Sequence, residues 1–321
     1  MEKEFVVGVD VGGQTSKIGV VDARGEVLAQ NAIRTDTYGE DADAYIAALT
    51  EGIKACVAQS GHSMAEIRGI GVGAPNANYY TGIIEFAPNI AWAAHHSVPF
   101  GEKLSAALDG IPVSLTNDAN AAAAGEMAYG AARGMKHFIM ITLGTGVGSG
   151  IVIDGKVVYG HDGLAGELGH TTVVRQNGRI CGCGKTGCLE AYCSATGIAR
   201  TATEWLSATD EPSLLRELDS ISSKDIYDAA KQGDAMALRL FEYTGTLLGQ
   251  SFADFVAFSS PEAIVLFGGL ARAKEFLYEP MKKAMEENLL KIWKGKIKIV
   301  FSQLKESDAA ILGASGLAWE L

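Results

Sequence analysis

The sequence is short of basic residues and has no long apolar run. Its 321 residues include 27 Lys and Arg against 38 Asp and Glu, which gives a formal net charge of −11. This acidic balance argues against a protein whose main work is to hold nucleic-acid phosphates. No apolar run approaches the ~18 residues of a membrane-spanning helix, and residues 1–5 lack the pattern of a signal peptide. We therefore expect no nucleic-acid or membrane partner and a cytoplasmic location.

Cysteine and proline are also scarce, whereas glycine is abundant. Four of the five cysteines fall between Cys181 and Cys193, and only 7 residues are proline. Without an export signal, such clustering favours a metal site or reduced thiols over disulfides. Glycine provides 39 residues, well above the ~7 % of ordinary usage. The glycines gather between apolar runs, which is typical of loops that turn tightly or approach a ligand closely.

Two similar segments about half a chain apart predict a duplicated α/β fold of two domains. Each has strand, glycine loop, strand, turn and strand, and the two glycine loops are expected to face each other across a ligand-binding cleft. In the first half we expect strands at 5–9, 17–21, from 27, at 67–72 and 113–116, with helices at 41–59 and 119–129. In the second half we expect strands at 138–143, 151–153, 157–158, 263–267 and 297–301, with helices at 223–248 and 308–317.

The two glycine loops are candidate phosphate sites. The first runs Asp10-Val11-Gly12-Gly13-Gln14-Thr15-Ser16, and the second Gly144-Thr145-Gly146-Val147-Gly148. Backbone N–H groups in such turns can hold phosphate oxygens, and a strand-end carboxylate such as Asp10 can hold Mg²⁺. A plain hairpin turn is the alternative for each loop. The second is neither a P-loop nor a dinucleotide fingerprint, because Gly-Lys-Ser/Thr is absent and a strand follows it.

Asn117-Asp118 closes a strand and precedes an alanine-rich segment. A carboxylate at that place can act as a general base at the bottom of a cleft. Aspartate is also a preferred N-cap, so Asp118 could simply cap the helix expected from Ala119. The residues alone leave both interpretations open.

His170 and the segment Cys181-Gly182-Cys183-Gly184-Lys185-Thr186-Gly187-Cys188 form the strongest local signal. One histidine and three cysteines at tight spacing match a structural Cys₃His zinc site, with redox or buried thiols as the alternative. Cys193 and Cys56 are interpreted as core thiols. Glu167 and Glu190 flank the metal motif, either as acceptors for the hydroxyls of a polyhydroxylated ligand or as solvated glutamates.

In combination, these motifs resemble the ROK sugar kinases of the hexokinase–actin superfamily, and most closely their bacterial glucokinases. The resemblance covers nearly the whole chain. It rests on the first glycine loop, Ala87-Pro88-Asn89-Ile90-Ala91-Trp92, Asn117-Asp118-Ala119-Asn120, Leu143-Gly144-Thr145-Gly146-Val147-Gly148, Gly166-Glu167-Leu168-Gly169-His170, and the cysteine motif with Leu189-Glu190.

The resemblance implies an actin/hexokinase-like (ribonuclease H-like) duplicated α/β fold with two domains around a cleft. The smaller domain would span 1–117 and be completed by helix 308–321, and the larger, with zinc, would span 118–307. The implied activity is ATP-dependent phosphorylation of a hexose, most simply glucose to glucose 6-phosphate. N-acetylmannosamine kinase and fructokinase are close alternatives. A sugar-sensing ROK regulator and a non-catalytic sugar-binding module are alternatives of other classes. A homo-oligomer, dimer or tetramer, is also implied.

The resemblance also implies roles for single residues. Asp118 would be the catalytic base, and Asp10 would help to place the Mg²⁺ that accompanies ATP. Sugar hydroxyls would be bound by Asn89, Asn117, Asp118, Glu167, His170 and Glu190. Structural Zn²⁺ would be held by His170, Cys181, Cys183 and Cys188. ATP would be bound at Gly12, Gly13, Gln14, Thr15, Gly144, Thr145 and Gly146, with Gly268 and Gly269 near the adenosine.

Three features bear on these expectations. The family's first loop usually reads Asp-x-Gly-Gly-Thr-Lys, whereas Gln14 and Ser16 intervene here, which predicts a longer turn. The family usually has Pro-Gly where this chain has Pro75-Asn76, so we expect Asn76 to reshape the sugar pocket. ROK regulators carry an N-terminal helix-turn-helix, and the first strand here is expected from Phe5, which favours the kinase.

Overall fold

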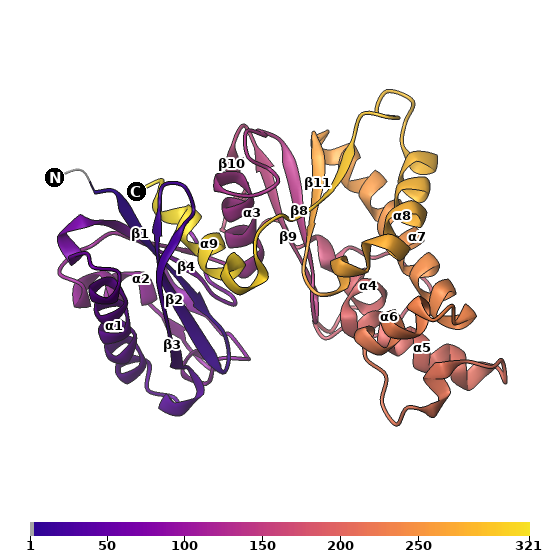
Figure 1. The fold of residues 1–321 in the computed structure, drawn as a ribbon, viewed down its shortest axis with the longest axis horizontal. Helices are drawn as coiled ribbons and strands as arrows, with labels where there is room; N and C mark the ends of the chain where they lie inside the picture. Colours follow the sequence, from indigo (N-terminus) through magenta and orange to yellow (C-terminus); the bar gives the residue numbers. More distant parts are fainter. Residues whose placement is uncertain (1–2) are drawn as a thin grey trace. The chain divides into compact units, whose positions relative to one another are not determined.

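The computed structural model describes residues 3–321, which form two compact α/β units (Figure 1). The first unit contains the chain up to Met135, together with Gly155–Gly166 and Gln303–Leu321, and the second contains Lys136–Asp154 and Glu167–Ser302. This division differs from the predicted boundary between residues 117 and 118. Helix α3 (Asp118–Ala128) belongs to the first unit because it packs along helix α9 (Glu306–Ala318).

Both units are built on a five-stranded sheet of the same topology. In the first, β1 (Phe5–Val11), β2 (Thr15–Asp22), β3 (Val27–Arg34), β4 (Ile67–Gly73) and β7 (Val113–Thr116) have the order β3-β2-β1-β4-β7. In the second, β8 (Phe138–Leu143), β9 (Val147–Ile153), β10 (Lys156–Val157), β11 (Ala263–Phe267) and β12 (Lys298–Phe301) have the order β10-β9-β8-β11-β12. The strands correspond one to one, so the predicted duplicated fold is confirmed.

The first hairpin of each sheet carries a glycine loop at its turn. Strands β1 and β2 are antiparallel, as are β8 and β9, and a parallel strand lies on the other side of β1 and of β8. Strand β9 begins at Val147, four residues earlier than predicted, because its register with β8 continues up to the loop.

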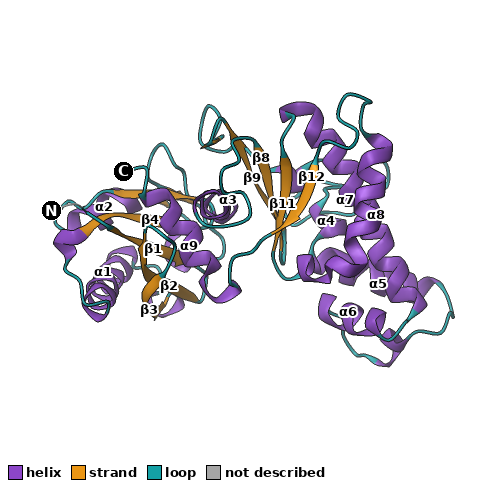
Figure 2. Cartoon of the chain, turned by 45° about the horizontal axis from the view of Figure 1, so that its top comes forward, coloured by secondary structure: helices purple, strands orange, loops and turns teal. Residues whose placement is uncertain are grey.

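The first sheet is covered by helices on both faces (Figure 2). Successive side chains of a strand point to opposite faces. Val7, Val9 and Val11 belong to one buried cluster with residues of α1 (Ala42–Gln59) and α2 (Phe100–Ala107), whereas Val6 packs with Ile311 of α9. The near-continuous apolar sequence of β1 thus reflects burial on two sides.

Helix α9 lies directly on the backbone of β1 and β4, although almost the whole chain separates it from β1 in sequence (Figure 1). A Cβ placed on Gly8 would lie 2.1 Å from the carbonyl oxygen of Ile311, and one on Gly71 would lie 1.9 Å from that of Ala314. Glycine at these two strand positions is therefore what allows the closing helix to pack on the sheet.

The second unit carries most of the remaining helices. They are α4 (Glu190–Cys193), α5 (Ala195–Ala208), α6 (Ser223–Lys231), α7 (Ala235–Ser259) and α8 (Lys274–Asn288). The predicted single helix over 223–248 is wrong. It divides at Gly233, whose φ is +83°, and the Asp234 side chain then caps α7 by accepting from Ala237 N–H. Helices α2, α4, α5 and α8 have no counterpart in the sequence prediction.

Short elements complete the described chain. They are β5 (Ile84–Glu85) and β6 (Ser97–Val98), which pair with each other, and the 3₁₀ turns Asp36–Tyr38, Met64–Glu66, Ala91–Ala93, Leu168–His170, Leu214–Glu217 and Leu270–Ala273. None of the helices in residues 3–321 is both long and apolar enough to cross a membrane.

Gly71→Ala should destabilise the first unit severely, because the added methyl group meets the backbone carbonyl of Ala314 and neither backbone can move freely. We expect the free energy of unfolding to fall by at least about 1–3 kcal/mol, the usual cost of overpacking a core. Denaturant unfolding measures it. Gly269→Ala is the control, because a Cβ there has no atom within 4 Å. Equal stability of the two variants would contradict the packing role of Gly71.

Candidate active site

Asp118 is the first residue of helix α3, and its neighbour caps the helix. The side-chain oxygen of Asn117 accepts the N–H of Asn120 at 2.8 Å. The interpretation of Asp118 as the N-cap is therefore wrong, and the helix begins one residue earlier than predicted. Because Asn117 performs the capping, the Asp118 carboxyl is available for other contacts.

The environment of Asp118 disfavours its charged form. Burial among protein atoms and the negative charge of Asp10 raise the pKa of the Asp118 carboxyl to about 7. Asp118 is nevertheless exposed at the surface, so a ligand can reach the carboxyl. Burial also raises the pKa of Asp10, and Lys17, its partner across the β1–β2 hairpin, acts in the opposite direction. Two neighbouring carboxyls of this kind are typical of a site for a cation or a proton acceptor.

The first glycine loop is a tight turn. Only Gly12, Gly13 and Gln14 lie between β1 and β2, and Thr35 N–H fixes the loop by donating to Gln14 O at 2.8 Å. The predicted longer turn is therefore wrong, because residues 15–17 belong to β2.

The polar side chains of this loop and of the start of β2 differ in exposure. Ser16 is buried, and its hydroxyl lies 2.7 Å from the hydroxyls of both Thr35 and Tyr45. Gln14 and Thr15 are exposed. Ser16 is thus part of the core, whereas Gln14 and Thr15 are accessible to a ligand.

Asn89 lies beside the first glycine loop. It is exposed on the segment between β5 and the 3₁₀ turn at Ala91, and a Cβ on Gly13 would lie 2.5 Å from the Asn89 carbonyl oxygen. The adjacent Trp92 is fully buried and stacks on Tyr45, with ring centroids 4.6 Å apart. The loop and the Asn89 segment are therefore contiguous parts of the first unit.

Asn76 holds the start of that segment. Its backbone φ is +54°, a left-handed conformation that glycine and asparagine adopt more readily than other residues. Its side-chain N–H₂ group donates to the carbonyls of Glu85 and Phe86, both at 3.0 Å. Asparagine can therefore adopt the left-handed backbone of this position, where the family usually has glycine. Its side chain adds two hydrogen bonds to the segment that leads to Asn89.

In the second unit, Glu190 fixes the second glycine loop. Its Oε2 accepts the N–H of Val147 at 2.9 Å, and its Oε1 lies 3.4 Å from Cys181 Sγ. A Cβ on Gly146 would lie 2.4 Å from Glu190 Oε2, so a larger residue there would displace this carboxylate from its present position. Gly268, which follows β11, lies close to the end of β8, because a Cβ there would lie 2.6 Å from Leu143 O.

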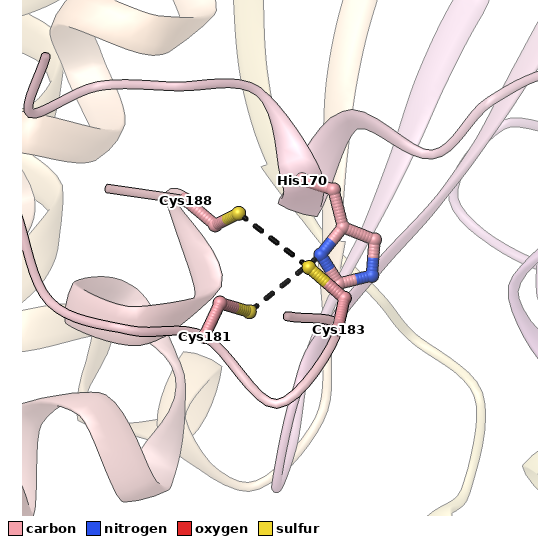
Figure 3. Close-up of side chains that lie close together, drawn as sticks. All are labelled: His170, Cys181, Cys183 and Cys188. Atoms are coloured by element: carbon pink, nitrogen blue, oxygen red, sulfur yellow. Dashed lines mark hydrogen bonds between the residues drawn. The ribbon is translucent and has the colours of Figure 1, made fainter. Parts of the chain in front are cut away.

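Four predicted metal ligands converge in the second unit (Figure 3). Their donor atoms all lie within 4.8 Å of one another. The Sγ atoms of Cys183 and Cys188 are 3.8 Å apart, and so are Cys181 Sγ and His170 Nδ1. With Zn–S bonds of ~2.3 Å, the ligand atoms of a tetrahedral site lie roughly 3.8 Å apart. The donor set and its spacing therefore fit one zinc ion.

The second ring nitrogen of His170 faces a carboxylate, and the two remaining cysteines lie outside the metal cluster. His170 Nε2 lies 3.9 Å from Oε2 of the exposed Glu167. The Cys193 thiol is buried and donates to Thr244 O, and Cys56 is buried under β2, as predicted for core thiols. Both ring nitrogens of His170 thus face groups of the candidate site.

The segment with the cysteines is fastened by Arg179, which the sequence analysis missed. The guanidinium donates to Thr201 Oγ1 at 2.8 Å and to Ala191 O at 3.0 Å, and it lies 4.4 Å from the ring centroid of Tyr192. It also pairs with Glu204. A single arginine in a polar stretch gives no sequence signal of such a role, because its partners come from α4 and α5.

The comparison with known families decides the family. The model of the ROK family matches residues 6–320, almost the whole chain. The chain belongs to the ROK family. It is 40 % identical to a glucokinase of Halalkalibacterium halodurans over 89 % of this chain and 86 % of that one. It also resembles the crystal structure of a ROK family glucokinase from Streptomyces griseus in complex with glucose and AMPPNP, with a TM-score of 0.77, 34 % identity, and coverage of 99 % of this chain and 100 % of the other.

ROK proteins of another class match as well. A xylose repressor of Caldicellulosiruptor bescii is 28 % identical over 96 % of this ROK chain and 76 % of the repressor. Membership of the ROK family therefore shows the fold and the type of site, and the choice between catalysis and sensing depends on the residues of the site.

Asp118→Asn should stabilise the folded chain at high pH. Folding raises the pKa of Asp118 from 3.8 to about 7, so the folded state favours the protonated carboxyl. The wild type therefore loses stability as the pH rises from about 4 to about 7, and the asparagine variant does not lose this contribution. We expect the melting temperature of the variant to exceed that of the wild type at pH 8, and the difference to shrink toward pH 4.

Asp109→Asn, in an exposed turn, is the control for this measurement. A variant at position 118 that shows the same pH dependence of melting as the wild type would contradict the raised pKa.

Proposed function

We propose that this ROK protein is an ATP-dependent sugar kinase whose substrate is glucose and whose product is glucose 6-phosphate. The similarity to a glucokinase over most of the chain supports this substrate, as does the similarity to a solved glucokinase that holds glucose and AMPPNP. N-acetylmannosamine and fructose remain the alternative acceptors.

The observation that carries the proposal is the state of the Asp118 carboxyl. It begins a helix that Asn117 caps, it remains accessible, and its pKa is about 7. A general base works best when its pKa lies near the working pH. In the proposed reaction Asp118 accepts the proton of the sugar hydroxyl while that oxygen attacks the terminal phosphorus of ATP. The bond between this phosphorus and the β,γ-bridging oxygen breaks, and ADP leaves with the electron pair.

The remaining expected ligands of the sugar offer suitable polar groups. The proposed hydroxyl partners are Asn89, Asn117, Glu167, His170 and Glu190. The Asn117 oxygen is used for capping, so its N–H₂ group is the part available to a sugar. Glu190 Oε2 already accepts the N–H of Val147. A carboxylate oxygen has two lone pairs, so it can accept a sugar hydroxyl at the same time.

Phosphoryl transfer depends mainly on positioning and on neutralising the charge of the phosphates. The proposed phosphate ligands are the backbone N–H groups of the two glycine loops, Gly12–Gly13 with Gln14 and Thr15, and Gly144–Thr145–Gly146. Mg²⁺ enters with ATP, and the Asp10 carboxyl would help to hold it.

We further propose that the cluster of His170, Cys181, Cys183 and Cys188 holds structural zinc. Four protein ligands saturate a tetrahedral ion, so it would fix the segment between His170 and Glu190 and would not activate water. A cytoplasmic location and a homo-oligomeric state remain predictions.

The function is tested with glucose, N-acetylmannosamine and fructose as acceptors for Mg-ATP, with ADP release as the readout. We expect the highest kcat/KM with glucose. Asp118→Asn should lower kcat by about 10²–10⁴, the usual contribution of a general base, while glucose binding measured by calorimetry persists. A near-normal rate for this variant would refute the assignment of the base. Sugar binding without ADP release in the wild type would favour the sensing or binding alternatives.

Cys183→Ser tests the metal site. We expect metal analysis to find about one zinc per wild-type chain and clearly less in the variant, because one of four ligands is lost. The melting temperature should fall as well. Cys56→Ser is the control for metal content, since it removes a buried thiol that lies outside the cluster. A wild-type chain that is purified without added chelator and contains no zinc would refute the site.

A further inference from the structure

We propose that Thr196 is a positioning residue for the second glycine loop, and that it orients the loop to bind nucleotide phosphate. The proposal deepens the proposed function and rests on it, because it takes Gly144–Thr145–Gly146 as a phosphate loop. Thr196 lies in the first turn of α5, outside every motif that the sequence analysis identified.

Protein donors hold all three carbonyls of this loop. Ala195 N–H donates to Gly144 O at 2.8 Å, and Thr196 Oγ1 donates to Thr145 O at 2.7 Å. The carbonyl of Gly146 accepts the N–H of Gly144 at 3.0 Å. Two consecutive residues at the start of α5 therefore hold two consecutive peptide groups of the loop.

The N–H groups of the same two peptides have no such partners. In the described part of the chain, no protein acceptor takes the N–H of Thr145 or of Gly146. Thr145 is exposed and Gly146 is partly exposed. Consecutive N–H groups without protein acceptors are the usual form of an anion site built from backbone.

The planarity of the peptide links these two observations. In a trans peptide the C=O and the following N–H point in opposite directions. Holding Gly144 O on Ala195 therefore turns Thr145 N–H away from α5, and holding Thr145 O on Thr196 does the same for Gly146 N–H. Because glycine flanks this turn, each peptide could otherwise rotate at low cost and present its carbonyl to the ligand. A carbonyl oxygen in that position would repel a phosphate.

The hydroxyl of Thr196 is itself oriented by a chain of hydrogen bonds. Ser194 Oγ accepts the N–H of Gly197 at 2.9 Å and lies 2.9 Å from Thr196 Oγ1. A hydroxyl has one proton. Since Thr196 gives its proton to Thr145 O, Ser194 must donate to Thr196. The N-cap of α5 therefore fixes the direction in which the Thr196 hydroxyl points.

The test compares Thr196→Val with Thr196→Ser. Valine keeps the shape and removes the donor, and serine keeps the donor. We expect calorimetry to show that the valine variant binds Mg-AMPPNP about threefold to tenfold more weakly, as for the loss of one hydrogen bond. The KM for ATP should rise by a similar factor with the KM for glucose unchanged, and serine should restore both.

Thr203→Val is the matched control on the same helix, because the Thr203 hydroxyl donates only within α5, to Ala199 O at 3.2 Å. A second variant, Ala195→Pro, removes the other donor. Ala195 is the first residue of α5 and Ser194 before it is extended, so proline suits the backbone there. The proline Cδ takes the place of the donated hydrogen and displaces the Gly144 carbonyl, so this variant should also weaken nucleotide binding.

The outcomes separate this proposal from the proposed function. Wild-type affinity for Mg-AMPPNP in both Thr196→Val and Ala195→Pro would overturn the positioning role and leave the kinase assignment intact. Equal loss of affinity in Thr196→Val and Thr203→Val would also overturn it. A wild-type chain that binds no nucleotide would overturn both, whereas nucleotide binding without phosphorylation of any sugar would overturn only the kinase assignment.

Discussion

The candidate site depends on how the backbone hydrogen bonds of two short turns are divided between the protein and a ligand. Backbone donors and acceptors that are buried must find partners. At the second glycine loop the carbonyls have partners in the protein, whereas two N–H groups have none among the described residues, so these two peptides present donors. The polarity of this loop therefore follows from the start of α5, which holds two of its carbonyls.

In the first unit, too, one residue makes the structural hydrogen bond and its neighbour stays available to a ligand. Asn117 caps α3 by accepting the N–H of Asn120, so the Asp118 carboxyl is not needed as the cap. Its raised pKa is an energetic cost to folding at neutral pH, and proximity to Asp10 adds to it. Such a cost is typical of functional sites, where local stability is given up for chemistry.

The metal cluster and the second glycine loop are mechanically connected. Glu190 follows the last cysteine of the motif and contacts both Val147 of the loop and Cys181 of the cluster. Arg179 fastens the same segment to α4 and α5. A metal ion in the cluster would therefore restrict a segment that also positions the glycine loop.

Much of this protein could be predicted from its sequence, because local patterns carry the information. Apolar runs bounded by short turns predicted most strands of the two sheets. The layout of strand, glycine loop, strand, turn and strand, repeated about half a chain later, predicted the duplicated topology. The four metal ligands lie close in sequence, with glycines between them, so their convergence was predictable. The single helix predicted over 223–248 failed because Gly233 and Asp234 end one helix and cap another, a local signal that the apolar spacing outweighed.

Tertiary structure decided what depends on contacts between distant segments. The sequence does not show that α3 packs on α9, that Ser16 is buried against Thr35 and Tyr45, or that Asn117 takes the cap and frees Asp118. Arg179 and Thr196 have no motif, since each acts on groups that only the fold brings near. The sequence by itself determined which residue types and turns are present, because these follow from local chemistry. The direction of each polar group at the site was decided by the fold, because its partner comes from another part of the chain.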